Sequence, residues 1–132
     1  MARYFQTRQI PKNVWLGVTV ENKREGLPRI DYLKSVKGAT IKFLSVEPLL
    51  EDLGQVDFSG LDWIIVGGES GPKARPMQKE WAINIKNQCE AQDIAFYFKQ
   101  WGTWGEDRKK RSKKENGHLL NNKTYREMPQ AA

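Results

Sequence analysis

Apolar residues gather in four short runs along the chain. The runs span residues 14–20, 41–46, 63–66 and 94–98, and they are rich in Val, Ile, Phe and Trp. Apolar and polar residues do not alternate cleanly within them, which is typical of strands buried on both faces of a parallel sheet. The pattern therefore predicts four mainly parallel strands covered by helices.

Two segments between these runs have helical patterns. Residues 29–37 follow Pro28, a residue favoured in the first turn of a helix, and they end before Gly38. Residues 79–92 place apolar side chains at four-residue steps, which predicts a longer helix with one apolar face. Residues 48–61 contain two glycines, and we expect a single helical turn and an irregular loop there.

Strands and helices alternate, which favours βα units with right-handed crossovers and places the chain in the α/β class. The pattern ends after Gly102, so we expect an α/β domain over residues 1–104 and a basic loop with a C-terminal flap over residues 105–132. Within the second segment, the residues on both sides of Asn121 and Asn122 predict either a small hairpin or a terminal flap.

A charged residue follows each predicted strand directly. Glu21, Glu47 and Glu69 come after the first three runs, and Lys99 comes after the fourth. The carboxyl ends of parallel strands meet at one face, where α/β proteins bind their ligands. One such glutamate is best explained as the partner of a helix N-terminus, but three in register favour a ligand site. The carboxylates need a cation, a shared proton or a basic partner such as Lys99 or Arg75.

Polar residues and glycines beside these charges extend the candidate ligand site. The glycine turn after the third run either lets the backbone approach a ligand closely or serves only as a tight connection to the next helix. Its spacing matches neither a Walker loop nor a complete dinucleotide fingerprint. The tryptophans after the fourth run either stack on a base or close the domain as a hydrophobic plug. The additional candidate residues are Asn22, Gly67, Gly68, Ser70, Gln100 and Trp101.

A short basic run accounts for the net charge of the chain, which is +6. Its six positive residues are Arg108, Lys109, Lys110, Arg111, Lys113 and Lys114. The remainder of the chain is therefore about neutral. The run is either a solvated loop or a contact surface for an anionic partner, and nucleic acid is the first candidate for that partner.

Cysteine and histidine are too few for several kinds of site. Cys89 is the only cysteine, which excludes an intrachain disulfide and a cysteine-only metal site, and its place on the apolar helix face predicts a core residue. The only histidine, His118, suggests no role. We assign no catalytic residue and no metal site. No apolar stretch is long enough to span a membrane and the N-terminal residues lack a secretory pattern, so we expect a cytoplasmic protein.

Four segments of the chain, in order, resemble the C-terminal part of a known family. They are residues 13–22, 43–50, 62–71 and 98–102, and residues 117–129 are similar to the end of the same family. The family is a phage-associated three-Cys-motif group of largely unknown function whose full-length members look like radical-S-adenosylmethionine proteins. The resemblance implies a partial (half) β/α barrel with the four strand-end charges at its mouth.

The resemblance also implies S-adenosylmethionine and an iron–sulfur cluster, but only for the full-length relatives. Three thiolates hold such a cluster, and this sequence lacks the three-cysteine region. We therefore expect no cofactor in the isolated chain. A half barrel exposes the edges of its sheet, so either a missing N-terminal half or a second copy in a homodimer is expected to cover them.

Two functions follow from the residues and the resemblance. In the first, the chain is a non-catalytic phage-associated binding protein that acts on a nucleic acid or on a nucleic-acid-handling partner, such as a host defence complex that it inhibits. In the second, it is the C-terminal half of a split or truncated enzyme that is active only with a separate cysteine-bearing part. The basic run favours the first, and the single cysteine argues against catalysis by the isolated chain.

Overall fold

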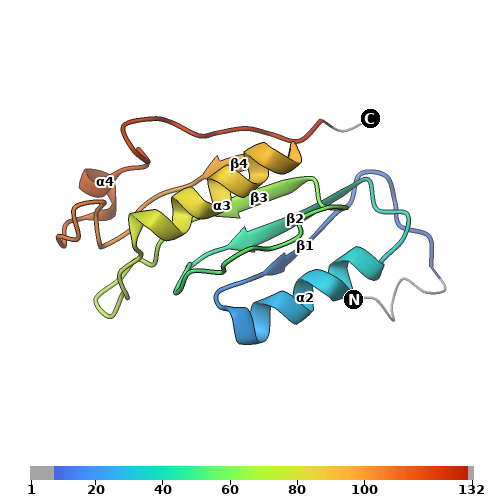
Figure 1. Ribbon diagram of the computed structural model, residues 1–132, viewed down its shortest axis with the longest axis horizontal. Helices are drawn as coiled ribbons and strands as arrows, with labels where there is room; N and C mark the ends of the chain where they lie inside the picture. Colours follow the sequence, from blue (N-terminus) through green and yellow to red (C-terminus); the bar gives the residue numbers. More distant parts are fainter. Residues whose placement is uncertain (1–7, 131–132) are drawn as a thin grey trace.

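A computed structural model describes residues 8–130 of the chain. The strands β1 (Trp15–Thr19), β2 (Ile41–Val46), β3 (Trp63–Val66) and β4 (Ala95–Phe98) form one sheet in chain order, and all three neighbouring pairs are parallel (Figure 1). This confirms the α/β class and the four parallel strands. The N-terminal residues 1–7, in which no secretory pattern was found, lie outside the described residues.

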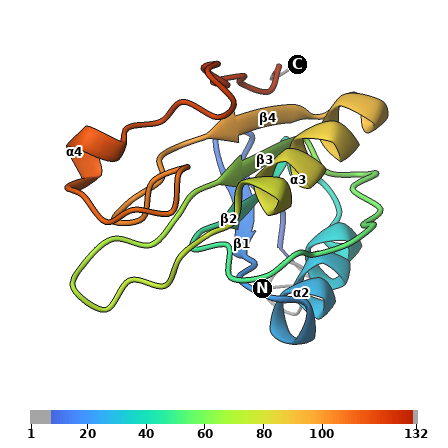
Figure 2. The same cartoon turned by 60° about the vertical axis from the view of Figure 1, so that its left-hand side comes forward.

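Helices α2 (Lys23–Ser35) and α3 (Lys79–Gln92) cover the same face of the sheet, as Figure 2 shows, and a short helix α4 (Lys113–Asn116) lies near the C-terminus. Strands in sequential order with helices on one face are the arrangement expected of half a β/α barrel. None of the described helices is long and apolar enough to cross a membrane.

The predicted start of the first helix is wrong by six residues. Helix α2 begins directly after Asn22, whose side-chain Oδ1 accepts a hydrogen bond from the backbone N–H of Glu25 at 2.9 Å and so caps the helix. Pro28 lies inside the helix rather than at its start, where it cannot donate the backbone hydrogen bond of an ordinary residue. The cap at Asn22 therefore decides where the helix begins, and the proline is tolerated.

The connection between β2 and β3 is irregular, as expected for residues 48–61, but it contains no helix, so the helical turn expected within it is wrong. A single hydrogen-bonded turn, from the N–H of Leu61 to the carbonyl of Phe58 at 3.0 Å, is what remains of it. The side-chain amides of Gln88 and Gln92 on α3 replace the missing helical bonds. Their Oε1 atoms accept hydrogen bonds from the backbone N–H groups of Val56 and Phe58, both at 2.7 Å.

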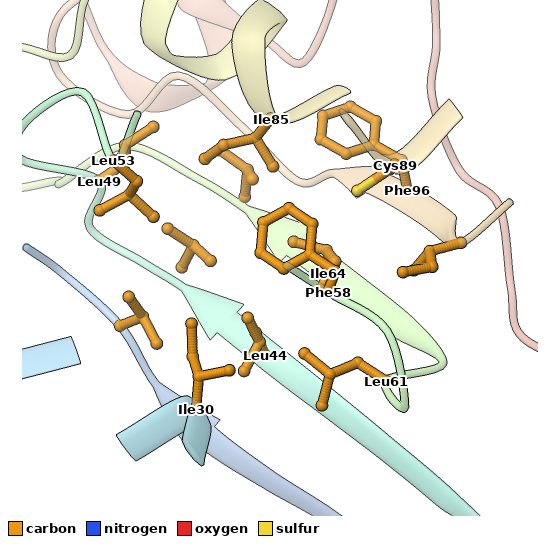
Figure 3. Close-up of a cluster of buried hydrophobic side chains, with 14 of the residues drawn as sticks. Ile30, Leu44, Leu49, Leu53, Phe58, Leu61, Ile64, Ile85, Cys89 and Phe96 are labelled. Atoms are coloured by element: carbon orange, nitrogen blue, oxygen red, sulfur yellow. The ribbon is translucent and has the colours of Figure 1, made fainter. Parts of the chain in front are cut away.

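The core lies between the sheet and the two long helices. Figure 3 shows side chains from the strands, from α2 and α3, and from the β2–β3 connection meeting there, with Phe58 in the middle. Leu49, Leu53 and Phe58 of the connection are almost completely buried. This irregular segment therefore covers the sheet in the place where a barrel would have a full helix.

The C-terminal segment covers the outer edge of β4. It runs antiparallel to the strand, with hydrogen bonds from the N–H of Phe98 to the carbonyl of Tyr125 at 2.8 Å and from the N–H of Glu127 to the carbonyl of Phe96 at 3.2 Å. The expected hairpin precedes it. Asn121 and Asn122 both have positive φ, 53° and 64°, as a two-residue type I′ turn requires.

The outer edge of β1 is open in the part of the chain that the structure describes. The N–H of Val20 donates to Ser45 on β2, so the alternation of the strand directs the carbonyl of Thr19 away from β2. The Arg29 guanidinium of α2 donates to this carbonyl at 3.0 Å. Among residues 8–130, only those of the C-terminal segment thus cover an edge of the sheet, that of β4.

Candidate functional site

The parallel sheet brings the strand-end charges to one end of the domain, where the strand arrows of Figure 1 point. Glu47 follows β2 and Lys99 follows β4, and their Oε2 and Nζ atoms lie 3.4 Å apart. The Ser45 hydroxyl donates to Glu47 Oε1 at 3.3 Å. The Glu47 side chain is 20% exposed and the Lys99 side chain 52% exposed. The pair therefore faces solvent at the mouth of the half barrel.

Gly67 leaves the space that Glu47 occupies. A methyl group at Gly67 would lie 3.1 Å from Glu47 Oε2 and 2.9 Å from Gln100 Nε2. The glycine thus lets two polar side chains cross the end of β3. Of the two alternatives for this turn, a close approach to a ligand and a tight connection, the structure shows the glycine making room for side chains of the domain.

Arg75 neutralises a second strand-end glutamate. Its Nε atom donates to Glu69 Oε2 at 2.9 Å, its NH2 group donates to Oε1 at 3.1 Å, and its backbone N–H donates to Oε2 at 3.0 Å. These hydrogen bonds lower the pKa of the Glu69 carboxyl. The pKa of Arg75 is raised, first by the hydrogen bond to Glu69 and also by the charge of Glu21. Arg75 is thus bonded to Glu69, and the charge of Glu21 acts on it from farther away.

Four other candidate residues hold the domain together. Asn22 caps α2. The N–H of Gly68 donates to the Gln100 carbonyl at 2.9 Å, and the Gln100 side chain donates back to the Gly68 carbonyl at 3.2 Å. Trp101 is 1% exposed, and its indole N–H donates to the Leu119 carbonyl at 2.7 Å. Trp101 is thus the hydrophobic plug of the two alternatives, whereas Ser70 is exposed beside the Glu69 site.

Residues 105–117, here called the basic lobe, have a defined structure. The Arg111 guanidinium donates to both carboxylate oxygens of Asp107, at 2.8 and 2.5 Å, and it lowers the pKa of that carboxyl far below its usual range. The Lys110 ammonium lies 5.1 Å from the centre of the Trp104 ring. The Ser112 side chain caps α4, a helix that the sequence pattern did not predict because it has only four residues.

The remaining cations of the basic lobe are free to meet a partner. Arg108, Lys109, Lys113 and Lys114 are exposed, and within residues 8–130 none of these four forms an ion pair within 4.0 Å. A hollow of about 450 Å³ lies beside the lobe, lined by Lys79 and Arg111 but also by Glu106, Asp107 and Glu115. Because its charges have both signs, the exposed cations outside the hollow are the better anion-binding surface.

Four aromatic side chains lie on the face of the sheet opposite α2 and α3. We call Trp15, Phe43, Trp63 and Tyr97 the aromatic row. The ring centres of neighbouring pairs are 5.8 to 6.0 Å apart. Each predicted strand carries one of these aromatic residues, which could have indicated the row from the sequence. Which face residues 8–130 leave without a helix becomes evident only once α2 and α3 are placed.

The residues of the chain do not fit an iron–sulfur cluster. Cys89 lies in the core beside Phe96 and Phe58 (Figure 3), and burial raises the pKa of its thiol to about 12. A cluster is held by thiolates, and one buried thiol cannot replace three. Within the described residues, no group of three His, Cys, Asp or Glu side chains is arranged to hold a metal ion.

Fold and site together define an open, parallel α/β domain with charge pairs at the strand ends and a basic lobe beside them. The chain matches the model of a family described as a protein of unknown function, DUF5131, over residues 1–129, and it belongs to that family. No curated protein and no solved structure matches the chain.

Proposed function

We propose that this chain is a non-catalytic binding protein that acts on a nucleic acid, or on a complex that handles nucleic acid, in the cytoplasm. Its resemblance to the phage-associated radical-S-adenosylmethionine-like family suggests a concrete setting, the inhibition of a host defence complex. The barrel-derived domain then serves as a scaffold, and cofactor chemistry plays no part.

The observation that carries this proposal is the exposed charge of the basic lobe. Arg111 and Lys110 are engaged with Asp107 and Trp104, which order the lobe, while Lys113 and Lys114 project from α4. An ordered cluster of exposed cations binds a phosphate backbone at a lower entropic cost than a disordered tail. When such cations meet phosphates, they displace counterions from the nucleic acid. This release favours binding at low salt.

A gel-shift assay over a salt series tests the proposal. We expect the chain to bind nucleic acid at low salt, with an affinity that falls linearly on a log–log plot. The double variant Lys113→Gln/Lys114→Gln should reduce the steepness of that plot by about 0.7 to 0.9 for each phosphate contact that is lost. The matched control is Lys37→Gln, an exposed lysine beyond the end of α2. Absence of binding at low salt would overturn the proposal.

The open β1 edge favours a second candidate function, the C-terminal half of a split or truncated enzyme. Parallel strands with an exposed edge add further strands readily, and the β4 edge is already occupied by residues of the C-terminal segment. A separate cysteine-bearing part would join at β1 and supply the thiolates for a cluster that this chain cannot hold.

Co-expression with such a cysteine-bearing part, followed by visible spectroscopy of the purified complex, tests this candidate. A coloured complex with the absorption of an iron–sulfur cluster would support it. A colourless product, or two parts that do not purify together, would rule it out.

A further inference from the structure

The aromatic row makes one continuous surface across the whole sheet. Each strand contributes one ring, and Trp63 at the centre contacts the other three, with ring-centre distances of 6.0 Å to Trp15, 5.9 Å to Phe43 and 5.8 Å to Tyr97. Trp15 is the most exposed of them, at 37%. Isolated exposed aromatic residues need no explanation, but a connected row on a sheet face that residues 8–130 leave without a helix marks a binding surface.

Neighbouring groups hold these rings in place. A methyl group at Gly17 would lie only 2.3 Å from Phe43 Cζ, so the glycine gives the Phe43 ring room to lie across β1. The Trp63 indole N–H donates to the Glu127 carbonyl at 2.9 Å, which ties the ring to the C-terminal segment. Rings that are already fixed lose little conformational entropy when a ligand arrives.

Positive charges lie at both edges of the sheet. The Arg126 guanidinium lies 4.7 Å from the centre of the Tyr97 ring and donates to the Tyr97 hydroxyl at 2.5 Å and to the Lys99 carbonyl at 2.9 Å. Arg29 lies at the opposite, β1 edge, where it binds the Thr19 carbonyl. Within residues 8–130 neither arginine forms an ion pair within 4.0 Å. The row thus has a cation against its β4 member, and the β1 edge of the same sheet carries a second cation at the carboxyl end of the strand.

We propose that the open face of the sheet binds single-stranded nucleic acid, with bases stacked on the aromatic row and phosphates near Arg29 and Arg126. The inference rests on the proposed function and assigns it a strand type and a second site. Unpaired bases offer their faces to aromatic side chains, whereas the bases of a duplex are already stacked on one another. Cations at both edges of the sheet favour a polyanion over an apolar protein surface.

Fluorescence anisotropy with a labelled oligothymidylate, and with a duplex of the same length, tests this proposal. Trp15→Ala should weaken binding of the single strand by about tenfold, because each stacked base contributes on this scale, and should leave duplex binding unchanged. Trp15→Phe keeps a ring and should retain most of the affinity. The matched control is Tyr32→Ala, because Tyr32 is 66% exposed and lies on α2, on the covered side of the sheet.

The outcomes separate the two proposals. If Trp15→Ala binds the single strand as tightly as the unmodified chain, while Lys113→Gln/Lys114→Gln still weakens binding, the open-face site is overturned and the proposed function stands. If the unmodified chain binds neither oligonucleotide at low salt, both are overturned. Sedimentation adds a further check: a dimer that Trp15→Ala dissociates would assign the face to a second copy and overturn the inference.

Discussion

The two faces of the sheet are made by the same four strands, yet they differ in chemistry. The face toward α2 and α3 carries aliphatic and phenyl side chains that are fully buried, such as Leu44, Ile64 and Phe98. The opposite face carries the aromatic row, whose rings are exposed or half-buried. Parallel sheets are normally covered on both faces. The covered face therefore supplies most of the buried apolar core, while residues 8–130 leave the rings of the opposite face partly exposed.

Phe58→Ala should give the largest loss of stability. The ring is completely buried between the sheet and α3 (Figure 3), and the irregular connection that carries it has no helix to keep it in place. We expect the free energy of unfolding to fall by about 3–5 kcal/mol, as for other large-to-small core changes. Urea unfolding measures this. A loss of stability as small as that caused by a substitution at an exposed site would contradict the distinction between the two faces.

Gly68→Ala should destabilise the strand-end region by about 1–3 kcal/mol. The new methyl group would lie 1.9 Å from the carbonyl oxygen of Trp101, a backbone atom that cannot move aside easily. Thermal unfolding is the appropriate measurement, with the exposed neighbour Ser70→Ala as the control. Equal stability of the two variants would contradict the tight packing between β3 and the residues after β4.

Trp15→Ala should cost less stability than Phe58→Ala, by our expectation about 1–2 kcal/mol, because its side chain is 37% exposed before the substitution. The substitution should change the affinity for single-stranded nucleic acid more clearly than it changes the free energy of unfolding. Urea unfolding and anisotropy on the same preparation compare the two quantities. A variant that unfolds easily but binds normally would reverse the roles assigned to the two faces.

Glu69→Gln should give the smallest of these changes in stability, and it tests the ion pair at the strand ends. Hydrogen bonds from Arg75 lower the pKa of Glu69 in the folded chain, so the ionised carboxylate stabilises the fold above its ordinary pKa. This stability is lost as the pH falls through the lowered value. Glu69→Gln should therefore make stability less sensitive to acid, by about 0.5 kcal/mol, since both partners are partly exposed. An unchanged acid dependence of the unfolding midpoint would contradict this.

The sequence predicted those elements whose signals are local. The bounds of β2, β3 and α3 agree with the apolar patterns, because each run is short and bounded by breaking residues. The start of α2 was missed because Pro28 is a stronger visible signal than the cap at Asn22. The irregular loop between β2 and β3 was predicted, but the helical turn in it was wrong because Gln88 bonds to its backbone from far along the chain.

The candidate site was predictable in part for the same reason. Strand order alone places Glu47 and Lys99 at the same end of the sheet, and the structure joins them. The aromatic row requires knowledge of which face the helices cover, and alternation within a strand does not supply it. Arg126 reaches Tyr97 only because the C-terminal segment pairs with β4, a long-range contact without a local pattern.

A nuclear magnetic resonance titration with oligothymidylate tests directly whether the open face is the binding face. The titration follows the indole N–H resonances of the tryptophans. Trp15 and Trp63 lie on that face, whereas Trp81 lies on α3 and Trp101 in the core. If the open face binds the strand, the signals of Trp15 and Trp63 shift on titration while those of Trp81 and Trp101 stay in place. Shifts confined to Trp104, which packs against Lys110 of the basic lobe, would contradict it, and so would Trp15 and Trp63 signals that do not shift.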